Sequence, residues 1–428
     1  MAGWFPPPGE LRDAAYATFA NTIGVGLWTA GGALYLTRVA GLPATVVGAG
    51  LSAAALVGLA ASVPAGRFAD RRDPRTLRAV LQVLQAGAAL LFLLVDSAAS
   101  FLAVAAVEAL LVTGNLAVRA ALVGALGRTA GRVHVFATLR TAANTGTAIG
   151  AGLAALALAA DSPAAYRLLV VADAATYLIS AALLMRLPRY PAADAAERPR
   201  TWEVWRDGRY LAVTATTSAM YLRRVVLTLV LPLWIATRAD VPTVVVSAVL
   251  VTYTVLTVVL SARFGRRAEQ AEPAARMVRR GSLVLAVAML GFAAATTLST
   301  AATVALLLAS TAVYSVGELW HVNGATGLSY ALAPEHAIGQ YQGVTVLLNG
   351  LAMAAGPALL TAVIVGSGSP AGWLLPIGLV TVCGLAVPPL TRWARTAPAR
   401  PAPRPSRSPA DPARSGIGKR PRRAAQRF

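Results

Sequence analysis

The sequence has few residues that could form disulfides or bind metals. Its one cysteine, Cys383, has no internal partner, and its three histidines, His134, His321 and His336, lie far apart in the chain. This spacing excludes a disulfide scaffold and a zinc module. We therefore expect no metal site and no cofactor.

Charged residues are also scarce. They make up 13% of the 428 residues, while hydrophobic residues make up 57%; a soluble domain carries about a quarter charged residues. The single lysine, Lys419, lies near the end of the chain, so no glycine-rich phosphate loop ending in Lys-Ser/Thr is present. No Ser/His/Asp order, paired metal ligands or nucleotide fingerprint stands in a suitable context. We expect an integral membrane protein that is not an enzyme.

Long apolar runs are abundant. A helix needs about 20 apolar residues to cross the hydrocarbon core of a bilayer, and twelve such runs predict an all-α protein with six spans in each half. The predicted spans are 15–38, 44–65, 76–96, 99–123, 140–160, 165–187, 209–236, 243–263, 279–298, 302–327, 341–366 and 371–392.

The polar break between the sixth and seventh spans divides the chain into domains. We expect a six-helix bundle at 1–187, a cytoplasmic linker at 188–208, a second six-helix bundle at 209–393 and a disordered basic tail at 394–428. Trp202 and Trp205 stand beside Arg206 and Arg209 in the linker. They fit a short helix at the bilayer surface, and a solvated linker fits equally well.

The formal charge of +20, from 38 Lys and Arg against 18 Asp and Glu, would suggest nucleic-acid binding in a polar protein. Here 33 of the 38 cations fall at one face, in the alternate loops and the terminal segments, with Arg78, Arg119 and Arg140 counted among the loop cations. The other face has three cations, Arg38, Arg167 and Arg238. This asymmetry predicts a multi-pass protein of the cytoplasmic (inner) membrane with both termini cytoplasmic. We expect no nucleic-acid partner, and we expect anionic lipid headgroups at the basic tail.

One loop motif resembles the signature of a known protein family. The segment Gly66-Arg-Phe-Ala-Asp70-Arg71-Arg-Asp-Pro-Arg75 follows the second span. It resembles the loop signature of the major facilitator superfamily, with departures at Asp73 and Pro74. An ordinary basic loop would explain the arginines but not the placement of Asp70. The run beginning at Tyr341 and the later Gly356-Pro357 are similar to those of bacterial drug-efflux-like facilitators.

The resemblance implies two six-helix bundles that rock around a central site. It further implies that Gly66, Asp70, Arg71 and Arg75 gate this motion. In the family reading Asp70 accepts hydrogen bonds from the start of the eleventh span, and this contact locks the outward-facing state.

Charged residues inside predicted spans are functional candidates, because each costs about 2.5 to 3.5 kcal/mol at the bilayer centre on insertion scales. Glu318 and His321 share a helix face with Tyr314, so Glu318 is a proton-coupling candidate and His321 a relay. The alternative is a carboxylate permanently paired with an arginine of the seventh span. Glu108 and Asp173 are further proton-coupling candidates.

The candidates for contact with a solute are polar or aromatic residues in the same spans. Adjacent Arg223 and Arg224 point about 100° apart on their helix, so only one can face the site, and the other is expected to have a structural role. The full set of substrate candidates is Arg223, Arg224, Tyr221, Asn21, Asn115 and Asn349. Asn21 and Asn349 fit helix–helix bridging equally well.

These observations predict a secondary transporter that acts by alternating access. Proton-coupled export of a small amphipathic or drug-like molecule, by an antiporter, is the first interpretation. Uptake or exchange of a small metabolite and a transporter-like sensor or scaffold are the alternatives. The expected partners are a small-molecule substrate, protons and the lipid bilayer, and the expected state is a monomer.

Overall fold

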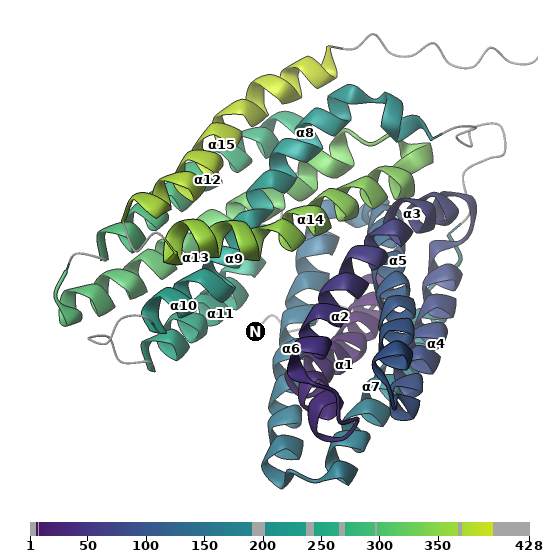
Figure 1. The fold of residues 1–428 in the computed structure, drawn as a ribbon. Helices are drawn as coiled ribbons and strands as arrows, with labels where there is room; N and C mark the ends of the chain where they lie inside the picture. The colour runs from purple at the N-terminus through teal and green to yellow at the C-terminus, as the bar shows by residue number, and fades with distance from the viewer. Residues whose placement is uncertain are drawn as a thin grey trace, which may run out of the picture. The chain divides into compact units, whose positions relative to one another are not determined.

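The computed structural model describes residues 6, 8–190, 202–236, 244–264, 270–295, 298–366 and 370–396, and within these ranges the regular structure is helical (Figure 1). The first half contains α1 (Glu10–Arg38), α2 (Ala44–Gly58), α3 (Ser62–Arg71), α4 (Pro74–Leu91), α5 (Ala98–Ala130), α6 (Arg132–Ala160) and α7 (Pro163–Leu184). The second half contains α8 (Gly208–Ala219), α9 (Arg223–Val225), α10 (Leu231–Ala236), α11 (Val244–Phe264), α12 (Ala271–Ala294), α13 (Thr300–Ala331), α14 (Ile338–Leu360) and α15 (Leu374–Arg395).

Short turns join some of these helices into longer spans. A 3-10 turn joins α2 to α3, and a 3-10 turn and the π-helical turn Val226–Val230 join α8 to α10 through α9. The result is twelve helical passes, six in each half, which confirms the predicted fold class. Nine of the described helices are long and apolar enough to cross a membrane.

Several arginines counted as loop cations lie within helices, and three of them lie inside or at the start of predicted spans. Arg78 is in α4, Arg119 in α5 and Arg140 in α6. The predicted spans 76–96, 99–123 and 140–160 include these three residues, and a buried guanidinium is tolerated when an internal acceptor meets it. Arg78 donates to Asn115 and Arg140 pairs with Glu318. Arg238, in the expected opposite loop, lies outside the described residues.

Local sequence explains several helix starts. Asp73 caps α4 and accepts a hydrogen bond from the Arg75 backbone N–H, with Pro74 in the first turn. Ser97 forms a capping box at α5, and Ser162 caps α7 ahead of Pro163. The departures from the family motif at Asp73 and Pro74 therefore form a helix-start signal.

Each half has its own apolar core, and a third core joins them. One cluster is drawn mainly from the second half and contains Phe292 and Tyr314. Another is drawn from the first half and contains Leu36 and Phe101. The third combines residues from both halves and from the linker, among them Leu122, Leu184, Val204, Tyr341 and Val344.

The linker contains the 3-10 turn Glu203–Arg206, flanked by Trp202. Trp202 is 41% and Trp205 48% exposed, while Val204 is fully buried. The expected short helix is therefore a single turn that is anchored to the protein at one residue. Residues 191–201 of the linker and 397–428 of the basic tail lie outside the described residues.

Candidate functional site

Helices α3 and α14 cross with almost no space between their backbones. A Cβ added to Gly66 would lie 2.0 Å from the Gly339 carbonyl oxygen, and one added to Gly339 would lie 2.1 Å from the Gly66 oxygen. One turn further along, a Cβ on Gly343 would lie 2.6 Å from the Ser62 oxygen. Small residues four apart on both helices therefore form the crossing, as in close helix pairs in membranes. Figure 1 shows α3 beside α14.

Asp70 fastens this crossing. Its Oδ1 accepts a hydrogen bond of 2.5 Å from the Gly339 N–H, and its Oδ2 accepts one of 2.8 Å from the Gln340 N–H. Both donors lie in the first turn of α14, where backbone N–H groups lack helical partners and the helix dipole favours an anion. The contact implied by the family resemblance, from Asp70 to the start of the eleventh span, is present. We call this end of the helices the Asp70 end.

The other residues of the motif have different partners. Arg75 is 7% exposed and donates to the Leu187 carbonyl oxygen at 2.5 Å, while its Nε lies 3.3 Å from Asp73. Asp73 also accepts from the Tyr190 backbone N–H at 3.2 Å. Arg75 therefore joins the start of α4 to the segment after α7 within one half. Arg71 ends α3 and is exposed.

The linker turn covers the crossing. The Val204 N–H donates to the Gln340 side chain at 3.0 Å, and Tyr341 donates to Asp207 at 3.0 Å. The Arg67 guanidinium stacks 4.8 Å from the Trp202 ring centre. The segment that connects the two halves in sequence thus also binds α14 in space.

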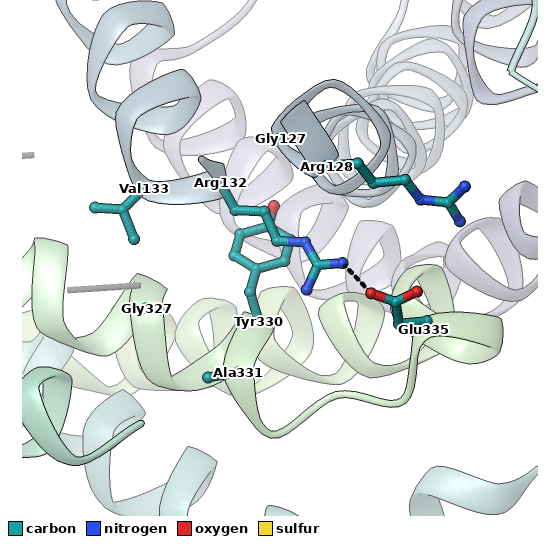
Figure 2. Close-up of a pocket in the computed structure, with 8 residues that line it drawn as sticks. All are labelled: Gly127, Arg128, Arg132, Val133, Gly327, Tyr330, Ala331 and Glu335. Atoms are coloured by element: carbon teal, nitrogen blue, oxygen red, sulfur yellow. Dashed lines mark hydrogen bonds and ion pairs between the residues drawn. The ribbon is translucent and has the colours of Figure 1, made fainter. Parts of the chain in front are cut away.

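A pocket of about 360 Å³ lies at the same end, between the α5–α6 turn and the end of α13 (Figure 2). In Figure 2 the Arg132 and Glu335 side chains point toward each other, and their ion pair measures 3.2 Å. Tyr330 donates to the Ala120 carbonyl oxygen at 2.8 Å. The pocket is lined by Gly127, Arg128, Arg132, Val133, Gly327, Tyr330, Ala331 and Glu335. None of the residues expected to contact a solute is among them.

Glu318 has a partner from the opposite half of the chain. Its carboxylate is 3% exposed and lies 3.3 Å from the Arg140 guanidinium of α6. This ion pair comes from Arg140 of the fifth span, and Arg223 and Arg224 of the seventh span lie within electrostatic range of the same carboxylate. His321 is 1% exposed, and neither ring nitrogen has a hydrogen-bond partner among the described residues. The described part of the chain contains no hydrogen bond from His321 to Glu318.

Arg223 and Arg224 diverge, as adjacent helix positions should. Arg223 is 2% exposed and donates to the Met220 carbonyl oxygen at 2.9 Å, and its guanidinium lies 5.6 Å from the Tyr221 ring. Arg224 is exposed, and it lies within electrostatic range of Glu318 and Tyr253. The residues around Glu318 are called the Glu318 cluster, namely Arg140, Arg223, Arg224, Tyr253, Tyr314 and Glu318.

A chain of polar side chains runs through the first half. Arg78 donates to Asn115 at 3.2 Å, and Asn115 donates to Gln85 at 2.6 Å. Further along, Tyr177 donates to Glu108 at 3.2 Å. Asn115 is 7% exposed, so its amide is occupied in bridging helices.

The remaining candidates lie apart from these groups. Asp173 is 4% exposed, and its Oδ1 has no hydrogen-bond partner in the described part of the chain. It lies close enough to Glu108 for the two carboxylates to repel each other. Asn21 in α1 and Asn349 in α14 are half-buried.

The sequence matches the model of the Major Facilitator Superfamily over residues 14–357. The chain belongs to the major facilitator superfamily. No curated protein matches it in sequence.

Solved structures of other facilitators share the fold. The human organic anion transporter MFSD10 (TETRAN) is 18% identical with a TM-score of 0.68, covering 89% of this chain and 100% of that one. A bacterial homologue of the iron transporter ferroportin, in an outward-facing state, is 13% identical with a TM-score of 0.69, covering 91% and 100%. The proton:xylose symporter XylE is 14% identical with a TM-score of 0.61, covering 89% and 96%. At these identities the similarity concerns the fold.

Sequence reasoning missed several residues of this facilitator's contacts. The charge count places Arg140 among the loop cations although it begins the predicted span 140–160, and no sequence motif marks Gly339. The four-residue spacing of Gly339 and Gly343, matching that of Ser62 and Gly66, was a readable signal for the close crossing. Nothing in the sequence alone indicates that Arg140 faces Glu318, because the pair is 178 positions apart.

Proposed function

We propose that this facilitator couples transport to protons and exports its substrate. As a member of the major facilitator superfamily it is a secondary transporter of small molecules and not an enzyme. The observation that carries proton coupling is the pair Glu108 and Asp173, whose electrostatic neighbours among the described residues include no arginine.

Two buried carboxylates within electrostatic range of each other are costly to hold ionised in a low-dielectric interior, and a bound proton removes one charge from the pair. Each carboxylate also has an oxygen without a hydrogen-bond partner among the described residues, Oε2 of Glu108 and Oδ1 of Asp173. Tyr177 donates to the other Glu108 oxygen. The unpaired oxygens are where a proton would be accepted.

Glu318 differs from this pair because Arg140 offers it a positive charge. An ionised carboxylate is favoured beside a guanidinium, so Glu318 is a weaker proton carrier than Glu108 or Asp173. His321 makes no hydrogen bond to Glu318 among the described residues, so both residues are weaker candidates for proton coupling than Glu108 and Asp173. Glu318 instead ties α13 to α6 across the two halves.

We further propose that the Asp70 end is cytoplasmic and that its contacts hold an outward-facing state. The contacts of Asp70, the linker turn and Tyr330 join the halves at this end, which supports the gating role of Gly66 and Asp70. In the same proposal Arg75 positions the motif, Arg71 faces solvent, both termini are cytoplasmic and the protein is a monomer of the cytoplasmic membrane. The basic tail then meets anionic headgroups.

Proton flux in proteoliposomes tests the coupling. Vesicles that contain the purified protein and a trapped pH-sensitive dye would be given an imposed pH gradient together with an internal substrate. Glu108→Gln and Asp173→Asn should abolish substrate-dependent proton entry, while Glu318→Gln should retain it. Glu272→Gln, at an exposed carboxylate that pairs with Arg395, is the matched control. Undiminished proton entry in both Glu108→Gln and Asp173→Asn would contradict the proposal.

A further inference from the structure

We propose that the Glu318 cluster binds an organic anion, so that the transported substrate carries a carboxylate or a comparable negative group. This rests on the proposed transport function and names the substrate class. The Arg140 guanidinium lies 3.3 Å from the Glu318 carboxylate, and those of Arg223 and Arg224 lie within electrostatic range of it. A substrate anion supplies the negative charge that the described protein groups do not.

Glu318 is the only acidic side chain that the described residues place near these arginines. Arg140 approaches it to 3.3 Å, and both groups are largely shielded, with side-chain exposures of 16% and 4%. The other described acids of the second half, Glu272 and Glu335, pair with Arg395 and Arg132 at helix ends. One carboxylate against three guanidiniums leaves an excess of two positive charges in the cluster.

The arginines differ in their exposure and in their hydrogen bonds. Arg223 is buried, donates one bond to the Met220 carbonyl oxygen, and leaves its Nε without a partner among the described residues. Arg224, next in sequence, is exposed within electrostatic range of Glu318. Arg224 is thus the group that an entering anion meets, and Arg223 adds a fixed positive charge behind it. Guanidinium forks suit the planar geometry of a carboxylate.

Aromatic rings beside the arginines fit the rest of such a molecule. Tyr253 packs edge-on to Tyr314 with ring centres 6.4 Å apart, and Tyr314 donates to the Arg223 backbone oxygen at 2.8 Å. Tyr221 lies against Arg223. A site with an apolar aromatic wall and a few charged groups orients an amphipathic ligand. The substrate class that follows is an aromatic or apolar acid.

In this proposal the Glu318 carboxylate competes with the substrate anion for Arg140. In the structure this carboxylate pairs with Arg140 of the opposite half. A substrate anion that takes over Arg140 breaks the tie between α6 and α13, so that binding loosens a contact between the halves. Neutralising Glu318 should therefore strengthen anion binding, whereas a purely structural Glu318 would give the opposite sign.

Two dyes with the same ring framework and opposite charge test the inference. Fluorescein is an anion and rhodamine 123 is a cation at neutral pH. Fluorescence polarisation with the purified full chain in lipid nanodiscs, without any gradient, gives a dissociation constant for each dye. We expect fluorescein to bind saturably and at least about tenfold more tightly than rhodamine 123, the size of one lost charge-assisted contact.

Three variants locate the site and a fourth, Arg38→Gln, is the control, each checked for a single size-exclusion peak. Arg224→Gln should weaken fluorescein binding about tenfold, with partial recovery in Arg224→Lys, and Glu318→Gln should strengthen it about threefold or more. Arg38→Gln removes an exposed arginine that pairs with Asp161 and should change binding less than about twofold. The dye comparison and Arg224→Lys keep the test decisive if a variant fails to fold.

The inference is overturned if fluorescein shows no saturable binding, if rhodamine 123 binds as tightly, if Arg224→Gln behaves like Arg38→Gln, or if Glu318→Gln weakens binding. Because the measurement uses no proton gradient, its failure is distinct from failure of the proposed coupling. Fluorescein binding that follows these rules, in a protein that shows no substrate-dependent proton flux, would uphold the anion site and reject the coupling.

Discussion

Replacing Asp70 with asparagine should release the Asp70 end. The carboxylate accepts two bonds from backbone N–H groups, at 2.5 and 2.8 Å. Asparagine keeps one acceptor oxygen and turns an amide NH2 toward the other donor. The change removes one charge-assisted bond and leaves one buried N–H unpaired, which together cost about 2 to 3 kcal/mol.

A free-energy change of this size shifts the equilibrium between closed and open Asp70 ends by about 30- to 150-fold. A population that is about 99% closed would then fall to roughly 40 to 75% closed. Substrate affinity at the Glu318 cluster should change much less, because Asp70 makes no described contact with it.

Double electron–electron resonance measures this shift. Nitroxides at Arg72→Cys and Arg276→Cys, both exposed sites in opposite halves, report the separation in a Cys383→Ser background. Asp70→Asn should add a longer-distance component. Asp161→Asn is the matched control, since Asp161 pairs with Arg38 inside one half and occupies a left-handed conformation that asparagine tolerates. Identical distance distributions for Asp70→Asn and the parent would refute the reasoning.

Three further perturbations have defined outcomes. Gly66→Ala should open the same end, because its Cβ would lie 2.0 Å from a facing backbone oxygen, whereas Gly87→Ala has nothing within 4 Å and should be silent; equal spin-label distances in both would reject the close crossing. In thermal unfolding, Arg140→Gln should cost less in a Glu318→Gln background, with a coupling of about 0.5 to 3 kcal/mol, and strict additivity would deny the pair. The hydrogen bond from a neighbouring tyrosine and the Arg38 ion pair hold the pKa of Asp161 below its ordinary value of 3.8, so the stability advantage over Asp161→Asn should be present above about pH 4 and disappear as the pH falls through the lowered pKa; a pH-independent difference in melting temperature would contradict it.

The sequence allowed the fold to be predicted because each pass is long and apolar enough to be read locally. The partner of Asp70 could also be predicted, because the family resemblance implies both the residue and the helix that it contacts. The partner of Arg140 could not be predicted, because the hydropathy of the surrounding sequence indicates only that a helix begins nearby. The burial of Arg140 depends on Glu318, which the chain brings from a helix far away.

The linker shows the same limit on a smaller scale. Its tryptophans indicated an amphipathic turn, but Val204, which the pattern did not single out, is the residue that is fully buried. Its backbone N–H binds Gln340. Contacts made by a backbone amide carry no side-chain signature, so they cannot be read from residue types.

The two sides of the Asp70 contact differ in how many substitutions they tolerate. The acceptor depends on one side chain, so most substitutions at position 70 remove it. The donors are backbone amides, which every residue except proline provides. Position 340 can therefore drift in sequence without loss of the bond, and position 339 is restricted by space alone. Among natural variants of this transporter, compensation for a lost Asp70 would have to come from outside the start of α14.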